Sequence, residues 1–184
     1  MIKRLLDFIL ALIAIFLLTP VYLIIFFLVL IKLQKPVFFK QTRPGLDGKS
    51  FMLLKFRTMT EELDVNGDLL ADSKRLTKFG RFLRSTSLDE LPSLLNVLMG
   101  NMSIVGPRPL VKNQFNMIPD NYKKKIIMLK PGITGIGSLV FRNEEKYLHS
   151  DVNDSNDFYK NEIVPFKASL ECWYHDNSSI FVDT

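Results

Sequence analysis

The first third of the chain contains a long apolar segment that the rest of the chain lacks. From Phe8 to Ile31 no residue is charged, and only Thr19, Pro20 and Tyr22 interrupt the apolar side chains. As a helix, at roughly 1.5 Å per residue, this segment would be about 36 Å long, which exceeds the roughly 30 Å of a bilayer's hydrocarbon core. The pattern therefore predicts a membrane helix.

Two features bear on whether this helix crosses the membrane. Pro20 lies near its middle, where a proline kinks or breaks a helix, and the Thr19 hydroxyl is suited to bond a freed carbonyl. Both flanks are basic, through Lys3, Arg4, Lys32, Lys35, Lys40 and Arg43. Basic flanks favour the cytoplasmic side, so a crossing helix satisfies this rule at one end and a re-entrant helix at both. The residues alone leave both topologies open, whereas the length of the run and the lack of a small-residue cleavage site disfavour a signal peptide.

Two short runs rich in β-forming residues follow, at residues 36–40 and 51–57. Turn residues separate them at 43–48, so the pattern predicts a β-hairpin. Lys55 and Arg57 fall on one side of the second strand, because side chains alternate along a strand. Such a pair is either solvated surface or a place to hold a diphosphate.

The stretch from Ser87 to Gly100 has the periodicity of an amphipathic helix. Leucines at 88, 91, 95 and 98 fall on one face, and Gly100 is suited to the C-cap. Ser87 is suited to the N-cap, with Glu90 completing a capping box three residues later. Asp89 would then complement the helix dipole from the first turn. These structural roles are sufficient to account for both acids.

Asp89 and Glu90 also fit a chemical role. The N-terminus of a helix is a site for a phosphoryl group, and its dipole would keep the Asp89 carboxylate ionised and nucleophilic. Arg84, just upstream, is placed to neutralise phosphate charge. Two adjacent carboxylates are also suited to share a magnesium ion. The residues leave the structural and catalytic interpretations open.

Arg108 stands between two prolines, after a short buried strand predicted at residues 102–105. The prolines stiffen the loop and aim the guanidinium, which suits forked recognition of phosphate. A surface arginine in a turn is the alternative interpretation.

The remaining segments give coarser predictions. Helices are predicted at 78–83, 121–129 and 159–174, and a strand at 138–141. The helix at 121–129 carries three consecutive lysines, which form either a solvated face or a contact with a membrane surface.

Composition and charge narrow the classes of partner. The 184 residues carry a net charge of +5, which suits nucleic acid, phosphorylated substrates or an anionic membrane surface. The single cysteine, Cys172, excludes an internal disulfide, and the two histidines form no Cys/His cluster for structural zinc. A hard, oxygen-liganded ion such as magnesium remains compatible with the sequence.

Several short strings occur together in a specific order and spacing. They are FKQTRPG at 39–45, KFRTM at 55–59, Leu83-Arg84 leading to SLDELP at 87–92, NV at 96–97, MSIVGPRP at 102–109 and KPGITG at 130–135. Together they resemble the bacterial sugar transferases of the monotopic phosphoglycosyl transferase family, from Lys3 to about Asp183. Members of that family start the assembly of lipid-linked glycans.

This resemblance implies an α/β fold with a small membrane-associated catalytic domain over residues 36–184. Residues 1–35 would form an N-terminal re-entrant membrane helix broken at a proline. Many members have Ser-Pro at the break, and Thr19-Pro20 offers the same hydroxyl here. The implied location is the bacterial inner (cytoplasmic) membrane, with the catalytic domain on the cytoplasmic face.

The resemblance also implies an activity: transfer of a sugar 1-phosphate from a UDP-sugar to polyprenyl (undecaprenyl) phosphate, with release of UMP. Asp89 matches the nucleophile that carries the phosphosugar between the two steps. Glu90 matches its acidic partner, and both are expected to hold magnesium. Lys55, Arg84 and Arg108 match positions around the phosphates and the metal.

Two departures limit what the resemblance implies. Ile136-Gly137-Ser138 stands where many members have a tryptophan after Thr-Gly, although Arg142-Asn143 still follows. We expect this region, with Arg142 as a substrate or phosphate contact, to touch the nucleotide-sugar, so the sugar is not assigned. The chain also ends at Thr184, earlier than many relatives.

Three alternatives remain. A non-catalytic membrane-anchored scaffold would use Asp89 only as a helix-dipole residue. A nucleic-acid-binding protein is permitted by the charge, but the chain has no recognised motif for it and the membrane segment argues against it. A transferase with a different acceptor lipid is the third. The expected partners are a UDP-sugar, polyprenyl phosphate and membrane lipids, without nucleic acid and with a homodimer left open.

Overall fold

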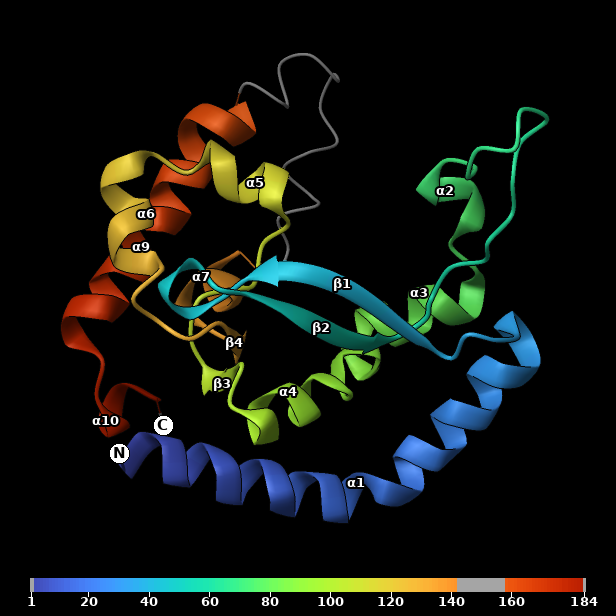
Figure 1. Ribbon diagram of the computed structural model, residues 1–184, viewed down its shortest axis with the longest axis horizontal. Helices are drawn as coiled ribbons and strands as arrows, with labels where there is room; N and C mark the ends of the chain where they lie inside the picture. The colour runs from blue at the N-terminus through green and yellow to red at the C-terminus, as the bar shows by residue number, and fades with distance from the viewer. Residues whose placement is uncertain (1, 142–157, 184) are drawn as a thin grey trace.

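The computed structural model describes residues 2–141 and 158–183. Its first element, α1 (Ile2–Leu33), is a helix of 32 residues that is long and apolar enough to cross a membrane. It runs along one side of the molecule, and its two halves lie at an angle to each other (Figure 1). The long apolar helix that the sequence predicts is therefore present, within a fold of mixed helix and sheet.

The region of Pro20 differs in detail from the expectation. The helix continues through Pro20 without a change of secondary structure. The Thr19 hydroxyl donates to the Ile15 carbonyl at 2.8 Å. The carbonyl that Pro20 leaves without its usual donor belongs to Phe16, because the helical bond runs from residue i to i−4. Thr19 therefore bonds a neighbour of the freed carbonyl.

The predicted hairpin is confirmed. β1 (Phe38–Pro44) and β2 (Ser50–Phe56) pair antiparallel around the short turn η1 (Leu46–Gly48). A second, separate sheet consists of β3 (Ser103–Val105) and β4 (Gly132–Thr134), which run parallel. Its strands meet where a glycine is required, since a Cβ at Gly132 would lie 2.2 Å from the Gly106 nitrogen. This close approach explains a glycine in each of the strings at 102–109 and 130–135.

The helices outside α1 are short until the C-terminal part. They are α2 (Asp72–Arg75), α3 (Lys78–Ser85), η2 (Leu88–Glu90), α4 (Ser93–Met99), α5 (Lys112–Met117), α6 (Asp120–Ile126), α7 (Ile136–Val140), the π-helix η4 (Tyr159–Ile163), α9 (Val164–Asn177) and α10 (Ile180–Asp183). The helices predicted at 78–83, 121–129 and 159–174 are thus confirmed as helical, with boundaries shifted by a few residues.

Two predictions about elements are wrong. Residues 138–141 were expected to be a strand, but α7 occupies 136–140, and β4 at 132–134 takes the place beside β3. Tertiary pairing overrides the local preference for strand there. The helix expected from residue 88 begins at Ser93 instead, after the separate turn η2. As a result Leu94 and Val97 face the core, while Leu95 is 37% exposed.

Both halves of α1 contribute to the hydrophobic core. Ile25, Val29 and Leu33 pack with Phe56 of β2 and Leu83 of α3. Ala11, from the other half, belongs to a second cluster with Leu53, Leu94, Val97 and Met102. A third cluster lies between α5, α6 and α9. Residues of α1 therefore share two of these clusters with the elements that follow.

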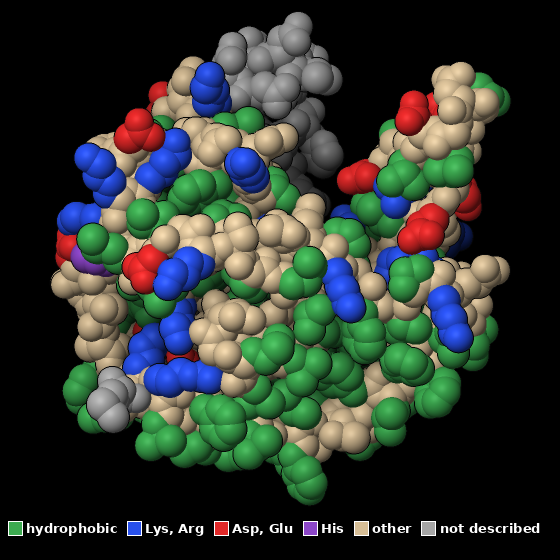
Figure 2. Space-filling view, viewed as in Figure 1, with side chains coloured by type: hydrophobic (Ala, Val, Ile, Leu, Met, Phe, Trp, Pro, Cys, Tyr) green, Lys and Arg blue, Asp and Glu red, His purple; other side chains and the backbone are tan. Residues whose placement is uncertain are grey.

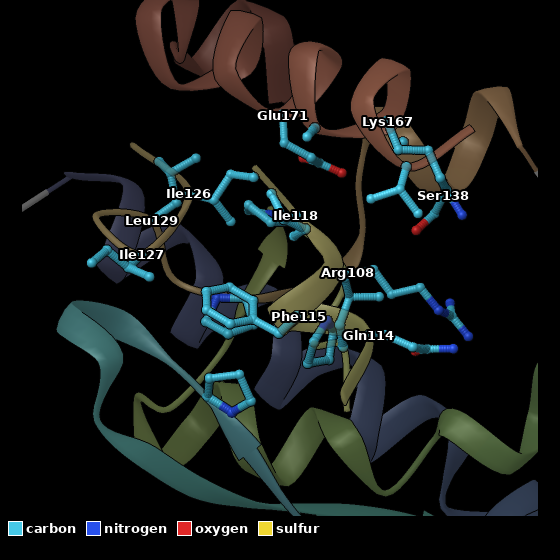
Figure 3. A pocket seen from close by; sticks show the side chains of 18 of the residues that line it. Arg108, Gln114, Phe115, Ile118, Ile126, Ile127, Leu129, Ser138, Lys167 and Glu171 are labelled. Atoms are coloured by element: carbon cyan, nitrogen blue, oxygen red, sulfur yellow. The ribbon is translucent and has the colours of Figure 1, made fainter. Parts of the chain in front are cut away.

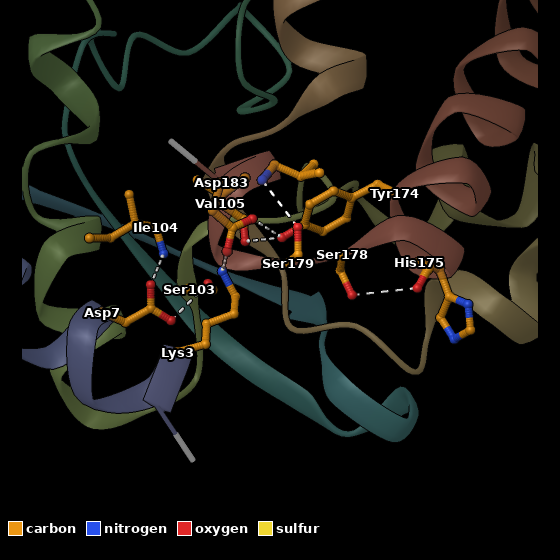
Figure 4. A network of polar contacts seen from close by, with 11 residues as sticks. Lys3, Asp7, Ser103, Ile104, Val105, Tyr174, His175, Ser178, Ser179 and Asp183 are labelled. Carbon is orange, nitrogen blue, oxygen red and sulfur yellow. Dashed lines mark hydrogen bonds and ion pairs between the residues drawn. The ribbon is translucent and has the colours of Figure 1, made fainter.

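Polar contacts anchor the N-terminal end of α1 to the same body. Asp7 is buried; it accepts a hydrogen bond from the Ser103 hydroxyl at 2.8 Å and one from the Ile104 amide at 3.1 Å (Figure 4). Arg4 donates to the carbonyls of Val97 and Leu98 in the last turn of α4, where helix carbonyls lack part of their usual intrahelical partners. Both ends of α1 are therefore joined to the α/β body.

The outward side of α1 is apolar and exposed. Phe16 is 78% exposed, Leu17 67% and Ile31 75%. In the space-filling view, hydrophobic side chains gather along the lower edge of the molecule, where α1 runs, and most charged side chains lie above them (Figure 2). A surface of this kind is suited to lipid.

Candidate functional site

The acidic pair lies on a tight turn and not at a helix N-terminus. Asp89 and Glu90 belong to η2, and Ser87 before them has a left-handed backbone with φ 58°. Ser87 makes no side-chain cap, because a capping residue needs an extended backbone. The predicted capping box is therefore wrong, and the Glu90 side chain is available for other partners.

Glu90 is held by two cations from different parts of the chain. Its Oε1 lies 2.5 Å from Lys55 Nζ on β2 and 3.3 Å from Arg108 Nη2 on the loop after β3. Burial alone would raise the pKa of Glu90, but Lys55 and Arg108 outweigh it and hold the pKa below its usual value. Three predicted site residues therefore meet at one carboxylate.

Asp89 has a different environment. It is 7% exposed, and burial raises the pKa of its carboxyl group above the usual value, against the opposing charges of Lys55 and Arg84. The expectation that a helix dipole keeps this carboxylate ionised is wrong, because η2 has a single turn and α4 begins four residues later. The cations near Asp89, and not a helix, favour its ionised form.

Arg84 and Arg57 have separate roles in the surroundings. Arg84 extends from α3; its Nε donates to the Thr58 hydroxyl at 3.0 Å, and its charge acts on Asp89. Arg57 is buried and bonds the Gln34 carbonyl at 2.8 Å and Glu61 at 3.3 Å. It is therefore neither solvated surface nor a partner of Lys55 in holding a diphosphate.

Glu90 opens onto a cavity, which we call the Glu90 pocket. The volume open to the centre of a water molecule is about 230 Å³. Its walls include the basic side chains of Arg43, Lys55, Arg108 and Lys167, together with Glu90. Such an excess of positive charge suits a ligand with several negative charges. Asp89 is adjacent in sequence but is not among the lining residues.

Arg43 is a member of this site that sequence reasoning did not single out. It lies on β1, bonds the Gln41 side chain at 2.6 Å, and has a buried Nε without a partner among the described residues. Burial and the neighbouring charge of Arg108 lower the pKa of its guanidinium. The signal was present in the string at 39–45, but nothing local to that string places Arg43 beside Arg108.

Magnesium is compatible with the acidic pair. Among residues 2–141 and 158–183, no cluster of three or more His, Cys, Asp or Glu side chains is found. Magnesium commonly uses only one or two carboxylates and completes its shell with water and substrate phosphate. Asp89 accepts no hydrogen bond from another side chain in the described part of the chain, so its oxygens suit this mode of binding. The predicted contact Arg142 lies outside the described residues.

Comparisons with known proteins agree on one family. A sequence model of the family described as bacterial sugar transferase matches residues 1–184. The chain is 45% identical over 173 residues to the uncharacterized sugar transferase EpsL of Bacillus subtilis, covering 92% of this chain and 77% of that protein. It is 37% identical over 164 residues to the exopolysaccharide production protein ExoY of Rhizobium meliloti, covering 80% and 72%.

A further relative carries a more specific name. The chain is 43% identical over 140 residues to the UDP-glucose:undecaprenyl-phosphate glucose-1-phosphate transferase of Escherichia coli K12. The match covers 73% of this chain but 30% of that longer protein.

Proposed function

This chain belongs to the bacterial sugar transferase family, and from that premise we propose that it transfers a sugar 1-phosphate from a UDP-sugar to polyprenyl phosphate. The observation that carries the proposal is the Asp89–Glu90 pair beside a pocket lined by Arg43, Lys55 and Arg108. Transfer of a phosphoryl group through a covalent intermediate requires a nucleophile, which a carboxylate can supply, and positive charge to stabilise the phosphate oxygens, which the pocket can supply.

The proposed reaction has two displacements at one phosphorus atom. An oxygen of Asp89 attacks the β-phosphorus, the bond to the bridging oxygen breaks, and UMP leaves with the electron pair of that bond. An oxygen of polyprenyl phosphate then attacks the same phosphorus and displaces the Asp89 carboxylate. The product is a polyprenyl-diphospho-sugar. Covalent catalysis thereby splits one hard displacement into two easier ones.

The chain's own residues supply charge and orientation. Lys55 and Arg84 favour the ionised form of Asp89 against the effect of burial. Arg43 and Arg108 are placed to contact phosphate oxygens in the Glu90 pocket and to stabilise the charge that spreads over them during transfer. Magnesium, held by Asp89, Glu90 and the diphosphate, would supply further neutralisation of charge when bound.

We also propose that α1 is re-entrant, so that the catalytic body lies on the cytoplasmic face of the bacterial inner membrane. Support comes from the contacts of both halves of α1 with one body, through Arg4 and Asp7 at one end and Val29 and Leu33 at the other. The most exposed apolar residue of the helix, Phe16, lies between these anchors. A helix of this shape would bring the site to the membrane surface, where a lipid phosphate is found.

The test is release of UMP by the purified protein with magnesium, undecaprenyl phosphate and a panel of UDP-sugars. We expect release with one or a few UDP-sugars, and Asp89→Asn to reduce the rate by about four orders of magnitude or more, as for loss of other nucleophiles. Asp68→Asn makes the same change at an exposed loop position and should retain activity.

Two outcomes would contradict the proposal. Release of UMP that persists in Asp89→Asn would remove the nucleophile role from Asp89. A folded wild-type protein that releases no UMP with any UDP-sugar would favour the membrane-anchored scaffold, in which the acidic pair is only structural.

A further inference from the structure

A second pocket lies beside the Glu90 pocket and shares a wall with it. The residues that line both are Arg108, Pro109, Leu110, Gln114, Tyr159 and Lys167. We call this second space the Glu171 pocket, because the Glu171 side chain extends into it from α9 (Figure 3). A ligand that fills the Glu90 pocket can therefore continue into the Glu171 pocket along the shared wall.

The Glu171 pocket is small and mostly apolar. Phe115, Ile118 and Leu129 contribute to its walls (Figure 3). The volume open to the centre of a water molecule is about 70 Å³, against about 230 Å³ in the Glu90 pocket. At roughly 10–15 Å³ for each water, that space admits one small flat group. The larger, cationic pocket is the better place for a diphosphate and its sugar.

Two buried polar atoms in the Glu171 pocket have no hydrogen-bond partner among the described residues. They are Oε2 of Glu171 and the hydroxyl oxygen of Ser138. Glu171 is only 7% exposed. The Glu171 carboxyl group accepts the Gly137 backbone N–H, and Oε1 is the oxygen that lies against Gly137. Buried polar groups without partners are costly, so a ligand that satisfies them gains affinity.

The local sequence is built to admit this carboxyl group. A Cβ at Gly137 would lie 2.5 Å from Glu171 Oε1, so any other residue there would displace the carboxyl group from this position. Burial raises the pKa of Glu171 to about 7, against the Gly137 hydrogen bond and the charge of Lys167. Near neutral pH the ionised form is therefore accessible, and in that form Oε2 is a hydrogen-bond acceptor.

We propose that the Glu171 pocket binds the uracil ring of the nucleotide-sugar, with Oε2 of Glu171 accepting the ring imide N–H and Ser138 donating to a ring carbonyl. This inference rests on the proposed function, which supplies a uridine nucleotide. Uracil presents an N–H donor between two carbonyl acceptors, and its faces are apolar. Cytosine has no N–H at the corresponding ring nitrogen, so the same pair of groups discriminates between the two bases.

The test measures binding of UMP and CMP to the full chain in detergent with magnesium, by titration calorimetry. In Glu171→Gln the side chain has one oxygen for two donors, the Gly137 N–H and the imide N–H. We expect affinity for UMP to fall about 10-fold or more, as when a buried donor is left unpaired. Affinity for CMP should fall less, because the new amide N–H can donate to the cytosine ring nitrogen. Glu162→Gln makes the same change at an exposed position on η4 and should bind as the wild type does.

A second variant keeps the inference testable if Glu171→Gln is unstable. Ser138→Ala removes only the unpaired hydroxyl, and we expect a several-fold loss of UMP affinity, as for one lost hydrogen bond. Wild-type affinity for UMP in both variants would overturn the inference and leave the proposed function intact. An equal loss for UMP and CMP would also overturn it, as would an altered choice among UDP-sugars with unchanged UMP affinity. A wild-type protein that binds no uridine nucleotide would overturn the proposed function as well.

Discussion

Asp89 and Glu90 are neighbours in the chain, yet their surroundings shift the pKa values of the two carboxyl groups in opposite directions. Burial raises the pKa of Asp89, while Lys55 and Arg108 outweigh burial and lower that of Glu90. Opposite shifts in adjacent carboxyl groups indicate different roles in a site. Glu90 is already fixed in two ion pairs and is suited to orient its neighbours. Asp89 forms no such ion pair with the described residues and is therefore the one suited to form a new bond.

Glu171 predicts how stability depends on pH in the protein without ligand. Burial raises the pKa of Glu171 in the folded protein to about 7 from an ordinary value of 4.5, so the folded state holds the proton more tightly than the unfolded chain. The stabilisation of the folded state by the protonated Glu171 carboxyl group is fully present below pH 4.5. It is lost as pH rises through 7, and the free energy of unfolding falls by up to about 3 kcal/mol. We expect wild type to lose more stability than Glu171→Gln between pH 5 and pH 8, measured by thermal unfolding.

The control for this effect is Glu162→Gln, whose stability should follow the wild-type dependence on pH, because Glu162 is exposed. Parallel curves for wild type and Glu171→Gln would show that Glu171 titrates as an ordinary carboxyl group.

At the residue scale, the sequence singled out three residues that the structure brings together, Lys55, Glu90 and Arg108, while their roles in a reaction stay a prediction. The capping role of Ser87 was wrong, because a left-handed backbone is not visible in a pattern of residue types. Arg43 and Glu171 were not singled out, because their environments depend on segments distant in the chain.

At the scale of elements, α4 supports the strand that carries Lys55. β2 pairs with β1 along one edge only, and α4 covers the other edge with side chains. Asn96 accepts the Leu54 N–H at 3.0 Å and donates to the Met52 carbonyl at 2.8 Å, and Ser93 donates to the Leu54 carbonyl. The backbone N–H and C=O groups at this edge of the hairpin thereby have hydrogen-bond partners without a third strand.

Replacing Asn96 should therefore destabilise the hairpin of β1 and β2. Asn96 is completely buried, so Asn96→Ala leaves the Leu54 N–H without its acceptor and opens a small cavity. We expect a loss of about 2 kcal/mol or more in the free energy of unfolding, measured by denaturant titration in detergent. Asn113→Ala, at an exposed position on α5, should have almost no effect. A similar small effect for both would show that the edge of β2 does not depend on Asn96.

The elements that the sequence predicted correctly are those whose signal is local. The hairpin has its turn residues, and α3 has its cap, since the Thr77 side chain accepts the Gly80 N–H. The strand predicted at 138–141 failed because β3 pairs with residues 132–134, a choice made by tertiary contact. The late start of α4 likewise follows from the turn η2, which interrupts an otherwise regular leucine pattern.

At the scale of the whole molecule, the two termini meet. Lys3 of α1 forms an ion pair with Asp183 of α10, and Asp183 also accepts a hydrogen bond from the Tyr174 hydroxyl at 2.6 Å (Figure 4). Together with the contacts of Arg4 and Asp7, this network fixes the start of α1 against the body. A helix that crossed the membrane completely would have to give up every one of these contacts.

The re-entrant topology therefore predicts that residue 2 and the catalytic body lie on one side of the membrane. Ile2→Cys and Ser178→Cys, each in a Cys172→Ser background, place single exposed thiols on α1 and beside α9. In intact cells we expect neither thiol to react with a membrane-impermeant reagent. In permeabilised cells we expect both to react.

A substitution at Pro20 tests the same topology by favouring a helix that crosses the membrane. Pro20→Ala restores the missing donor and removes the clash with the preceding turn, so a straight helix becomes more favourable. We expect part of the Ile2→Cys population to become reactive in intact cells in the Pro20→Ala background, with Ser178→Cys still protected. A reactive residue 2 with Pro20 intact would mean that α1 crosses the membrane. Since Arg4 could not then reach the Val97 carbonyl, that result would also exclude the packing of the N-terminal half of α1 in the bilayer.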